Sequence, residues 1–176
     1  PMYPQYSRTT NGSSLNDFTR TARRMGVTDL NVRALCCFPD NPKMIRAMAD
    51  MIRPAVASVP EAERARTPLL FSAHGLPQSV VDGGDPYQEH VRRTTELVVR
   101  ELGGYPLVHN CYQSRVGRQV WLKPFTVDLV KELIAQKVPR IIMYPVAFVT
   151  DHSETLYELD MLYGDQIRAA GIAFDR

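Results

Sequence analysis

Residues 141–160 of the chain read IIMYPVAFVTDHSETLYELD, and this stretch decides the fold. Its first nine residues are almost all apolar, which is typical of a strand covered on both faces of a sheet. Thr150 or Asp151 then stands where a helix N-cap is expected. The stretch therefore predicts a buried parallel strand that leads directly into a helix.

Ionisable side chains crowd the start of this predicted helix. Because helical residues three or four apart share a face, Asp151, Glu154 and Glu158 are predicted to form one acidic stripe. Ligands of open α/β sheets bind where strands end, so the corner is a candidate site. The helix dipole also favours acidic residues in a first turn, which is a purely structural alternative.

Apolar runs alternate with helical patterns along the rest of the chain. This order implies right-handed crossovers and a Rossmann-like open parallel α/β sheet of about four strands, with helices on both faces. Strands are predicted at 32–38, 69–71, 107–112 and 141–149, with 1–7 as an edge strand or an extended connection. Helices are predicted at 15–25, 42–58, 87–102 and 126–136.

Sulfur-containing side chains are predicted to belong to the core of this fold. Cys36 and Cys37 lie within the first apolar run and are interpreted as small core residues. Met44, Met48 and Met51 are spaced to form the buried stripe of the helix over 42–58.

Composition limits the class of protein. The 176 residues are 44% hydrophobic and 23% charged, which fits one well-cored domain with extensions. A net charge of +2 argues against a nucleic-acid partner. Three cysteines without a CxxC spacing favour a reducing, cytosolic-type compartment. The chain starts with Pro, so we expect an internal segment of a longer protein.

Several polar side chains are predicted to meet at the carboxyl edge of the sheet. His74 ends the second predicted strand, and residues 113–115 follow the third. Trp121, in the next loop, is either a wall of a flat pocket or a plug of the core. An imidazole facing carboxylates binds a divalent metal such as ferrous iron or passes protons. The residues alone predict a metal-dependent or acid–base α/β enzyme.

Five motifs together resemble the ferrochelatase family. They are YPQYS with TTNGSS at the start, FSAHGLP at 71–77, GDPY at 84–87, QSRVG with WLKP within 113–124, and PVAFVTDHSETLYELD at 145–160. Ferrochelatases are lyases of haem biosynthesis that insert ferrous iron, their substrate, into a porphyrin between two similar Rossmann-like domains. The resemblance implies that residues 1–30 are an inter-domain connection with its first helix and that 31–176 form the C-terminal domain.

The resemblance also implies roles for individual residues. His74 matches the active-site histidine, an iron ligand or the base for a pyrrole proton, and Glu154 matches the opposing acid and metal ligand. The remaining matches are a metal or proton path of Asp151, His152 and Glu158, and porphyrin contacts of Trp121, Phe148 and Tyr112.

Three positions depart from the pattern of some family members. Arg8 stands where certain members have a cysteine ligand of an iron–sulfur cluster, so no such cluster is predicted within this segment. Leu162 replaces an acid, which shortens the acidic path, and Tyr112 replaces a tryptophan.

The expected function is conversion of protoporphyrin IX to protohaem. Coproporphyrin as the substrate, or cobalt as the metal, are alternatives within the family, and a non-catalytic metal- or tetrapyrrole-binding module is the alternative outside it. The expected partners are the porphyrin and a missing N-terminal domain of the same chain. We expect the segment to lie in the cytoplasm, with peripheral membrane contact left open, and to turn over poorly or not at all in isolation.

Overall fold

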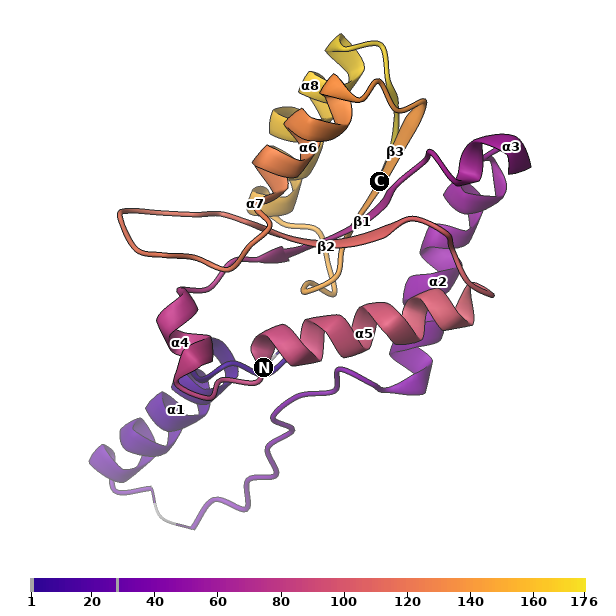
Figure 1. Ribbon diagram of the computed structural model, residues 1–176. Helices are drawn as coiled ribbons and strands as arrows, with labels where there is room; N and C mark the ends of the chain where they lie inside the picture. The colour runs from indigo at the N-terminus through magenta and orange to yellow at the C-terminus, as the bar shows by residue number, and fades with distance from the viewer. Residues whose placement is uncertain (1, 28) are drawn as a thin grey trace.

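The computed structural model describes residues 2–27 and 29–176, and its centre is a parallel sheet with strand order β2-β1-β3-β4 (Figure 1). The central strand β1 pairs with β2 from Leu69↔Val108 to His74↔Gln113, so both strands end at the same level. The predicted open parallel sheet is confirmed. The strands are β1 (Leu69–His74), β2 (Val108–Gln113), β3 (Arg140–Pro145) and β4 (Ala173–Asp175).

Helices cover both faces of the sheet (Figure 1). On one face lie α2 (Pro42–Ala57) and α5 (Tyr87–Glu101); on the other lie α6 (Thr126–Ala135), the π-helical η2 (Leu156–Tyr163) and α8 (Gly164–Ala169). Because successive strand residues point to opposite faces, Leu69 and Phe71 pack with α2 and α5, whereas Leu70 packs with α6 and α8. The shorter helices are η1 (Arg8–Gly12), α3 (Glu61–Arg64), α4 (Gln78–Asp82) and α7 (Ser153–Thr155).

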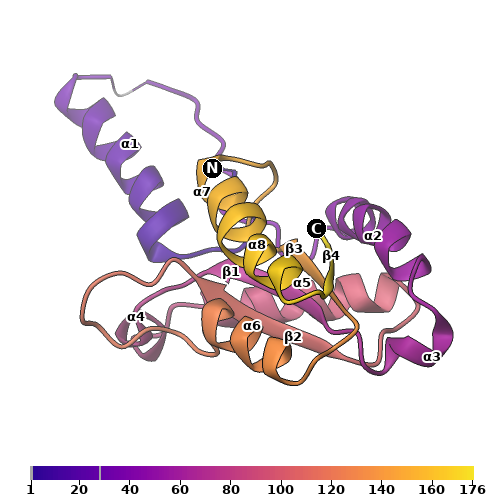
Figure 2. The ribbon, with the colours of Figure 1, turned by 90° about the horizontal axis from the view of Figure 1, so that it is seen from above.

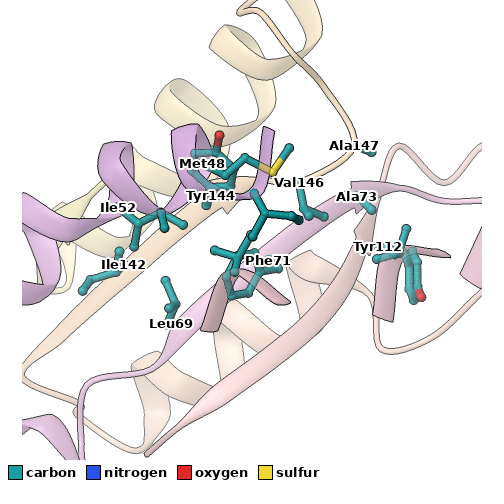
Figure 3. Packing of buried hydrophobic residues seen from close by; sticks show 14 of the residues in the cluster. Met48, Ile52, Leu69, Phe71, Ala73, Tyr112, Ile142, Tyr144, Val146 and Ala147 are labelled. Carbon is teal, nitrogen blue, oxygen red and sulfur yellow. The ribbon is translucent and has the colours of Figure 1, made fainter. Parts of the chain in front are cut away.

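The core beneath α2 is built from close contacts between that helix and the sheet. Figure 3 shows Met48 and Ile52 of α2 beside Tyr144 of β3, with Phe71 of β1 below them, all in one buried cluster. The rings of Phe71 and Tyr144 meet edge to face with their centroids 6.3 Å apart. Burial of each such apolar side chain contributes about 1.5–3 kcal/mol to folding, so this face anchors the strands that carry the site.

The predicted strand over 32–38 is wrong. Residues 29–38 have no regular secondary structure, and Cys36 is exposed rather than buried, while Cys37 is partly exposed. Two backbone bonds of this run involve Phe38: its amide donates to the Pro4 carbonyl at 2.8 Å, and its carbonyl accepts from the Asn41 amide at 3.2 Å. An apolar run forms a strand only when another strand pairs with it, and none of the described residues supplies one. The fourth strand is instead β4, whose three residues are too short to form a recognisable pattern.

The methionine stripe of α2 is also only partly correct. Asn41 caps the helix as expected, since its Oδ1 accepts bonds from the amides of Lys43 and Met44 at 3.0 and 3.3 Å. The buried face, however, holds Met48 but not Met51, which is 71% exposed. Ile45, Met48, Ala49 and Ile52 make up that face.

The corner between β3 and the next helix also differs in detail from the prediction. β3 ends at Pro145, four residues before the expected end, and the Phe148 amide turns back to the Pro145 carbonyl. The helix cap is His152, not Thr150 or Asp151: the Thr155 hydroxyl accepts a bond from the His152 amide at 3.0 Å. The helical residues thus begin at Ser153, leaving Asp151 outside the helix.

The beginning of the chain is an extended connection rather than an edge strand. Residues 2–7 form neither helix nor strand, and Gln5 and Ser7 are fully buried. The Asp85 carboxylate accepts bonds from the Ser7 hydroxyl and the Arg8 amide at 3.1 and 2.7 Å. The following α1 (Ser13–Arg24) projects away from the sheet and buries none of its residues (Figure 2). Its Phe18 is 47% exposed. Across the described parts of the chain, no helix is long and apolar enough to cross a membrane.

Candidate active site

His74 and Glu154 meet at the carboxyl edge of the sheet. His74 is the last residue of β1, and Glu154 lies in α7, directly after the β3 corner. The His74 Nδ1 and Glu154 Oε1 atoms are 2.9 Å apart. Eighty residues of sequence separate the two groups, and the parallel sheet brings their elements to the same edge, as the sequence predicts.

The Glu154 carboxylate is bound through one oxygen. Oε1 accepts bonds from His74 Nδ1, from Gln113 Nε2 at 3.2 Å and from Ser114 Oγ at 2.8 Å. Every hydrogen bond recorded between Glu154 and the described residues ends on Oε1, so Oε2 is free to bind a ligand. The bond from His74, together with those from Ser114 and Gln113, lowers the pKa of Glu154 to about 2 against the opposing effect of burial.

The imidazole of His74 is likewise bound on one side. Nδ1 faces the carboxylate and therefore carries the proton of that bond, so Nε2 is left with a lone pair when the ring is neutral. The backbone is fixed as well, because the Tyr87 hydroxyl donates to the His74 carbonyl at 2.9 Å. Burial raises the pKa of Tyr87 above its ordinary range, so this phenol stays neutral and keeps its proton.

Glu158 is joined to Glu154 by the hydroxyl of Ser114. The Ser114 Oγ lies 2.8 Å from Glu154 Oε1 and 2.9 Å from Glu158 Oε2. Burial raises the pKa of Glu158, opposite to the shift of Glu154. Two neighbouring carboxyl groups with opposed pKa shifts can divide proton-accepting and charge-bearing roles between them.

Asp151 and His152 lie apart from this pair of carboxyl groups. The Asp151 Oδ1 accepts a bond from Arg176 Nη1 at 2.7 Å, which lowers the pKa of Asp151. The His152 ring packs edge to face on Phe148, with centroids 4.3 Å apart. The predicted three-acid stripe is therefore divided: Glu154 and Glu158 come together, whereas Asp151 turns to an arginine.

A cavity of about 190 Å³ opens beside His74 and Glu154. Phe148, Leu76 and Ala147 give it an apolar wall, and the segment before α1 supplies Tyr3, Gln5 and Thr10. A second cavity, of about 390 Å³, adjoins it, since Phe148 and Glu154 line both, and His152 lines this one. An apolar wall next to a few polar groups is the usual character of a small-molecule site.

Two of the predicted porphyrin contacts do not line either of these cavities. Tyr112 packs on the face of the sheet that α2 and α5 cover, and it lines a separate cavity together with Gln88 and Lys123. Trp121 lies against Gly75, and its Nε1 donates to the Val116 carbonyl at 3.0 Å. A Cβ atom at Gly75 would stand 2.9 Å from the Gln113 carbonyl, so only glycine fits between β1 and this loop.

Gln113 and Ser114 are site residues that sequence reasoning did not single out. The turn over 113–115 was expected at this edge, yet no role in the site followed from it. The signal was available in part, because polar residues at the end of a parallel strand point to a site. Arg115 of the same turn stacks instead on the Phe125 ring, 4.5 Å from its centroid.

The arrangement offers two protein ligands to a metal ion, an imidazole nitrogen and a carboxylate oxygen. Within residues 2–27 and 29–176, no group of three or more His, Cys, Asp or Glu side chains stands ready to hold a metal. A site with two protein ligands leaves other coordination positions to water or to a substrate.

Comparison with known proteins extends over the whole chain. The family model described as Ferrochelatase matches residues 1–176. Curated proteins named Ferrochelatase are 40% identical in Geotalea daltonii, 38% in Aquifex aeolicus and 41% in Phenylobacterium zucineum. The matches cover 97%, 97% and 98% of this chain but 52%, 53% and 48% of those relatives. The chain therefore spans about half the length of the curated relatives it matches.

Proposed function

Because the chain belongs to the ferrochelatase family, we propose that it forms one wall of a site that inserts ferrous iron into a porphyrin. The observation that carries the proposal is the His74–Glu154 pair, 2.9 Å apart, which leaves His74 Nε2 and Glu154 Oε2 free beside a cavity with an apolar wall. These two atoms are the proposed ligands of the incoming ion. Imidazole and carboxylate together suit ferrous iron.

The opposed pKa shifts suggest how the two carboxyl groups divide the work. Glu154, with a pKa of about 2, stays ionised at neutral pH and supplies the negative charge that draws in a cation. So acidic a group is a weak proton acceptor. Glu158, whose pKa is raised, accepts a proton more readily. The Ser114 hydroxyl connects it to Glu154 and thus to the cavity. A porphyrin must lose two N–H protons as iron enters, and we propose that Glu158 accepts them one at a time and passes each to water. His74 is the base for one of them only in the alternative in which its Nε2, the single lone pair of the neutral ring, does not hold the ion.

The path of the ion is proposed to follow the second cavity. His152 and Glu154 both line it, and the exposed Asp151 directly precedes His152 in the chain. Phe148 stands between the two cavities and is the proposed contact for the flat face of the macrocycle.

We also propose that Trp121 and Tyr112 contact the porphyrin. Residues 1–30 are the proposed inter-domain connection with its first helix, residues 31–176 are the proposed C-terminal domain, and the proposed location is the cytoplasm.

A second domain of the same chain is proposed to close the site. The cavity of about 190 Å³ is smaller than the roughly 300–1,000 Å³ of pockets that enclose drug-sized ligands. A porphyrin therefore needs a further wall, and we expect the 176 residues alone to turn over poorly or not at all.

The test compares a longer protein that carries this sequence and a second domain with its His74→Ala and Glu154→Ala variants. Insertion of Fe²⁺ into protoporphyrin IX is followed anaerobically by the loss of porphyrin fluorescence. Each variant is expected to lose at least about 100-fold in rate, the usual contribution of a positioned acid or base. Wild-type rates in both variants contradict the site. Coproporphyrin and Co²⁺ in the same assay separate the alternative chelatases, and porphyrin binding without turnover favours a binding module.

A further inference from the structure

We infer that Gln113 is a positioning residue that decides which oxygen of Glu154 faces the cavity, and that Ser72 acts on the site through Gln113. The inference rests on the proposed function, since it concerns the carboxylate that would hold the metal ion. It assigns a role to buried side chains that do not reach the cavity themselves.

A line of buried polar side chains runs beneath Glu154. Gln113 is 2% exposed, and both Ser72 and Thr126 are fully buried. The Ser72 Oγ lies 2.7 Å from Gln113 Oε1 and 3.0 Å from Thr126 Oγ1. At the other end of the Gln113 amide, Nε2 lies 3.2 Å from Glu154 Oε1. The line thus leads from the first residue of α6 through β1 and β2 to the site.

The donors in this line can be assigned from the chemistry of its ends. Gln113 Nε2 donates to Glu154 Oε1, which already accepts from His74 and Ser114, so the NH₂ group of the Gln113 amide faces the carboxylate. Gln113 Oε1 then faces Ser72 and accepts the single Ser72 hydroxyl proton. Ser72 Oγ has no second proton to give, so the Thr126 hydroxyl donates to it. Each hydroxyl donates once, and one orientation of the amide satisfies every member.

The flipped amide would set two acceptors against each other. With Gln113 Oε1 toward Glu154, the carboxylate would lose one of the three donors on its Oε1 and gain a repulsive neighbour. Ser72 also disfavours the flipped amide, because its hydroxyl would lose Gln113 Oε1 as the acceptor of its hydrogen bond. The buried line therefore keeps Oε1 of Glu154 occupied and leaves Oε2 for the ion.

Rigid elements hold this arrangement in place. Ser72 and Gln113 lie within β1 and β2, whose pairing register is fixed along six residues. The Gly75 amide also donates to the Gln113 carbonyl at 2.9 Å. Groups that orient a metal ligand in this way typically change metal affinity about 10–100-fold when they are removed.

The test measures binding of Co²⁺, as a probe for ferrous iron, to the 176-residue chain by isothermal titration calorimetry. Ser72→Ala and Gln113→Leu are each expected to weaken Co²⁺ binding about 10-fold. The double variant is expected to be no weaker than Gln113→Leu alone, because Ser72 has nothing left to orient. His74→Ala is expected to abolish binding. If Gln113→Leu fails to fold, Ser72→Ala still tests the inference, since it removes one buried hydroxyl that does not contact Glu154.

Thr95→Ala is the matched control. Its hydroxyl is also buried and donates to a side-chain amide oxygen of β2, Asn110 Oδ1, at 2.6 Å, but outside the site. It is expected to lower the melting temperature as Ser72→Ala does and to leave Co²⁺ affinity unchanged.

Three results contradict the inference in distinguishable ways. Unchanged affinity in Ser72→Ala and Gln113→Leu, with binding lost in His74→Ala, overturns the positioning role and leaves the proposed function standing. Additive losses in the double variant overturn the claim that Ser72 acts through Gln113. Absence of Co²⁺ binding by the wild-type chain, or binding that persists in His74→Ala, overturns the inference and the proposed metal site together.

Discussion

Two acidic corners share the segment 151–160 and differ in what compensates their charge. Glu154 is held by an imidazole, an amide and a hydroxyl, all on one oxygen. Asp151 and Asp160 are instead held by the guanidinium of Arg176, with Nη1 2.7 Å from Asp151 Oδ1 and Nη2 2.8 Å from Asp160 Oδ2. A permanent cation closes the second corner, whereas the first keeps a free oxygen and a free nitrogen.

The number of acids in a sequence therefore does not identify a metal site. A carboxylate can bind a metal ion only when its hydrogen-bond and ion-pair partners leave one of its oxygens without a partner. Arg176 carries its charge at every physiological pH and uses both ends of its guanidinium. His74 offers one nitrogen to the carboxylate and keeps the other, so the same interaction that fixes Glu154 also preserves a ligand atom.

The largest effect that separates the two corners is on metal affinity. Glu154→Gln in the 176-residue chain is expected to weaken Co²⁺ binding by more than about 100-fold, since loss of a ligand exceeds the loss of a group that orients one. Asp160→Asn removes an acid of the other corner and is expected to change the affinity less than about twofold. Calorimetric titration measures both. Equal losses in the two variants would show that the second corner also binds the ion.

The reverse contrast is expected for folding stability. Arg176→Ala leaves two acids without their cation, and its side chain is only 14% exposed, so we expect a loss of about 1–2 kcal/mol in the free energy of unfolding. Arg53→Ala, which removes an exposed arginine paired with Asp50, is the matched control and is expected to cost less than about 0.5 kcal/mol. Urea denaturation at neutral pH measures both changes. A loss in Arg176→Ala no larger than in Arg53→Ala contradicts the structural role of the second corner.

The sequence predicts the parts of this comparison that depend on local pattern. The pattern of β2, VHNCYQ, is weak, and only its last three residues are buried. β1 instead opens with the apolar run 69–71, which the sheet buries, so its pattern and its environment agree. The run at 32–38 has the same pattern, but its fate depends on a pairing strand that local sequence does not reveal. The position of Glu154 opposite His74 follows from parallel topology together with the family resemblance.

Pairing between distant side chains is what the sequence leaves undetermined. Asp151 and Arg176 are 25 residues apart, and no spacing rule joins them. Ser114 adopts a φ of +64°, a conformation that serine seldom takes and that the sequence does not reveal, and its hydroxyl lies within hydrogen-bond distance of both glutamates. The direction of the Gln113 amide likewise depends on partners from two other elements, Ser72 of β1 and Glu154 of α7.

Stability at acidic pH is expected to report the Glu154 interactions. The pKa of this carboxyl falls from 4.5 to about 2 on folding, so its stabilising contribution is complete above about pH 4.5 and is lost as the pH falls toward 2. The wild-type free energy of unfolding should therefore drop over this range more steeply than that of Glu154→Gln. Urea denaturation between pH 5 and pH 3 measures the two slopes. Parallel slopes would mean that the His74–Glu154 bond does not persist in solution.

The smallest effect concerns Glu158, whose pKa shifts the other way. Burial disfavours its ionised form, so the stability that this group contributes is full below its unfolded pKa and declines as the pH rises through its higher folded value. Glu158→Gln is neutral at every pH and keeps an acceptor for the Ser114 hydroxyl. It should therefore be slightly more stable than the wild type at pH 7, and this advantage should disappear at pH 4.

Thermal unfolding of Glu158→Gln and of the wild type at the two pH values measures the difference. An advantage that stays the same at both would assign the gain to packing, and a loss at pH 7 would show that Glu158 is held as an anion, like Glu154.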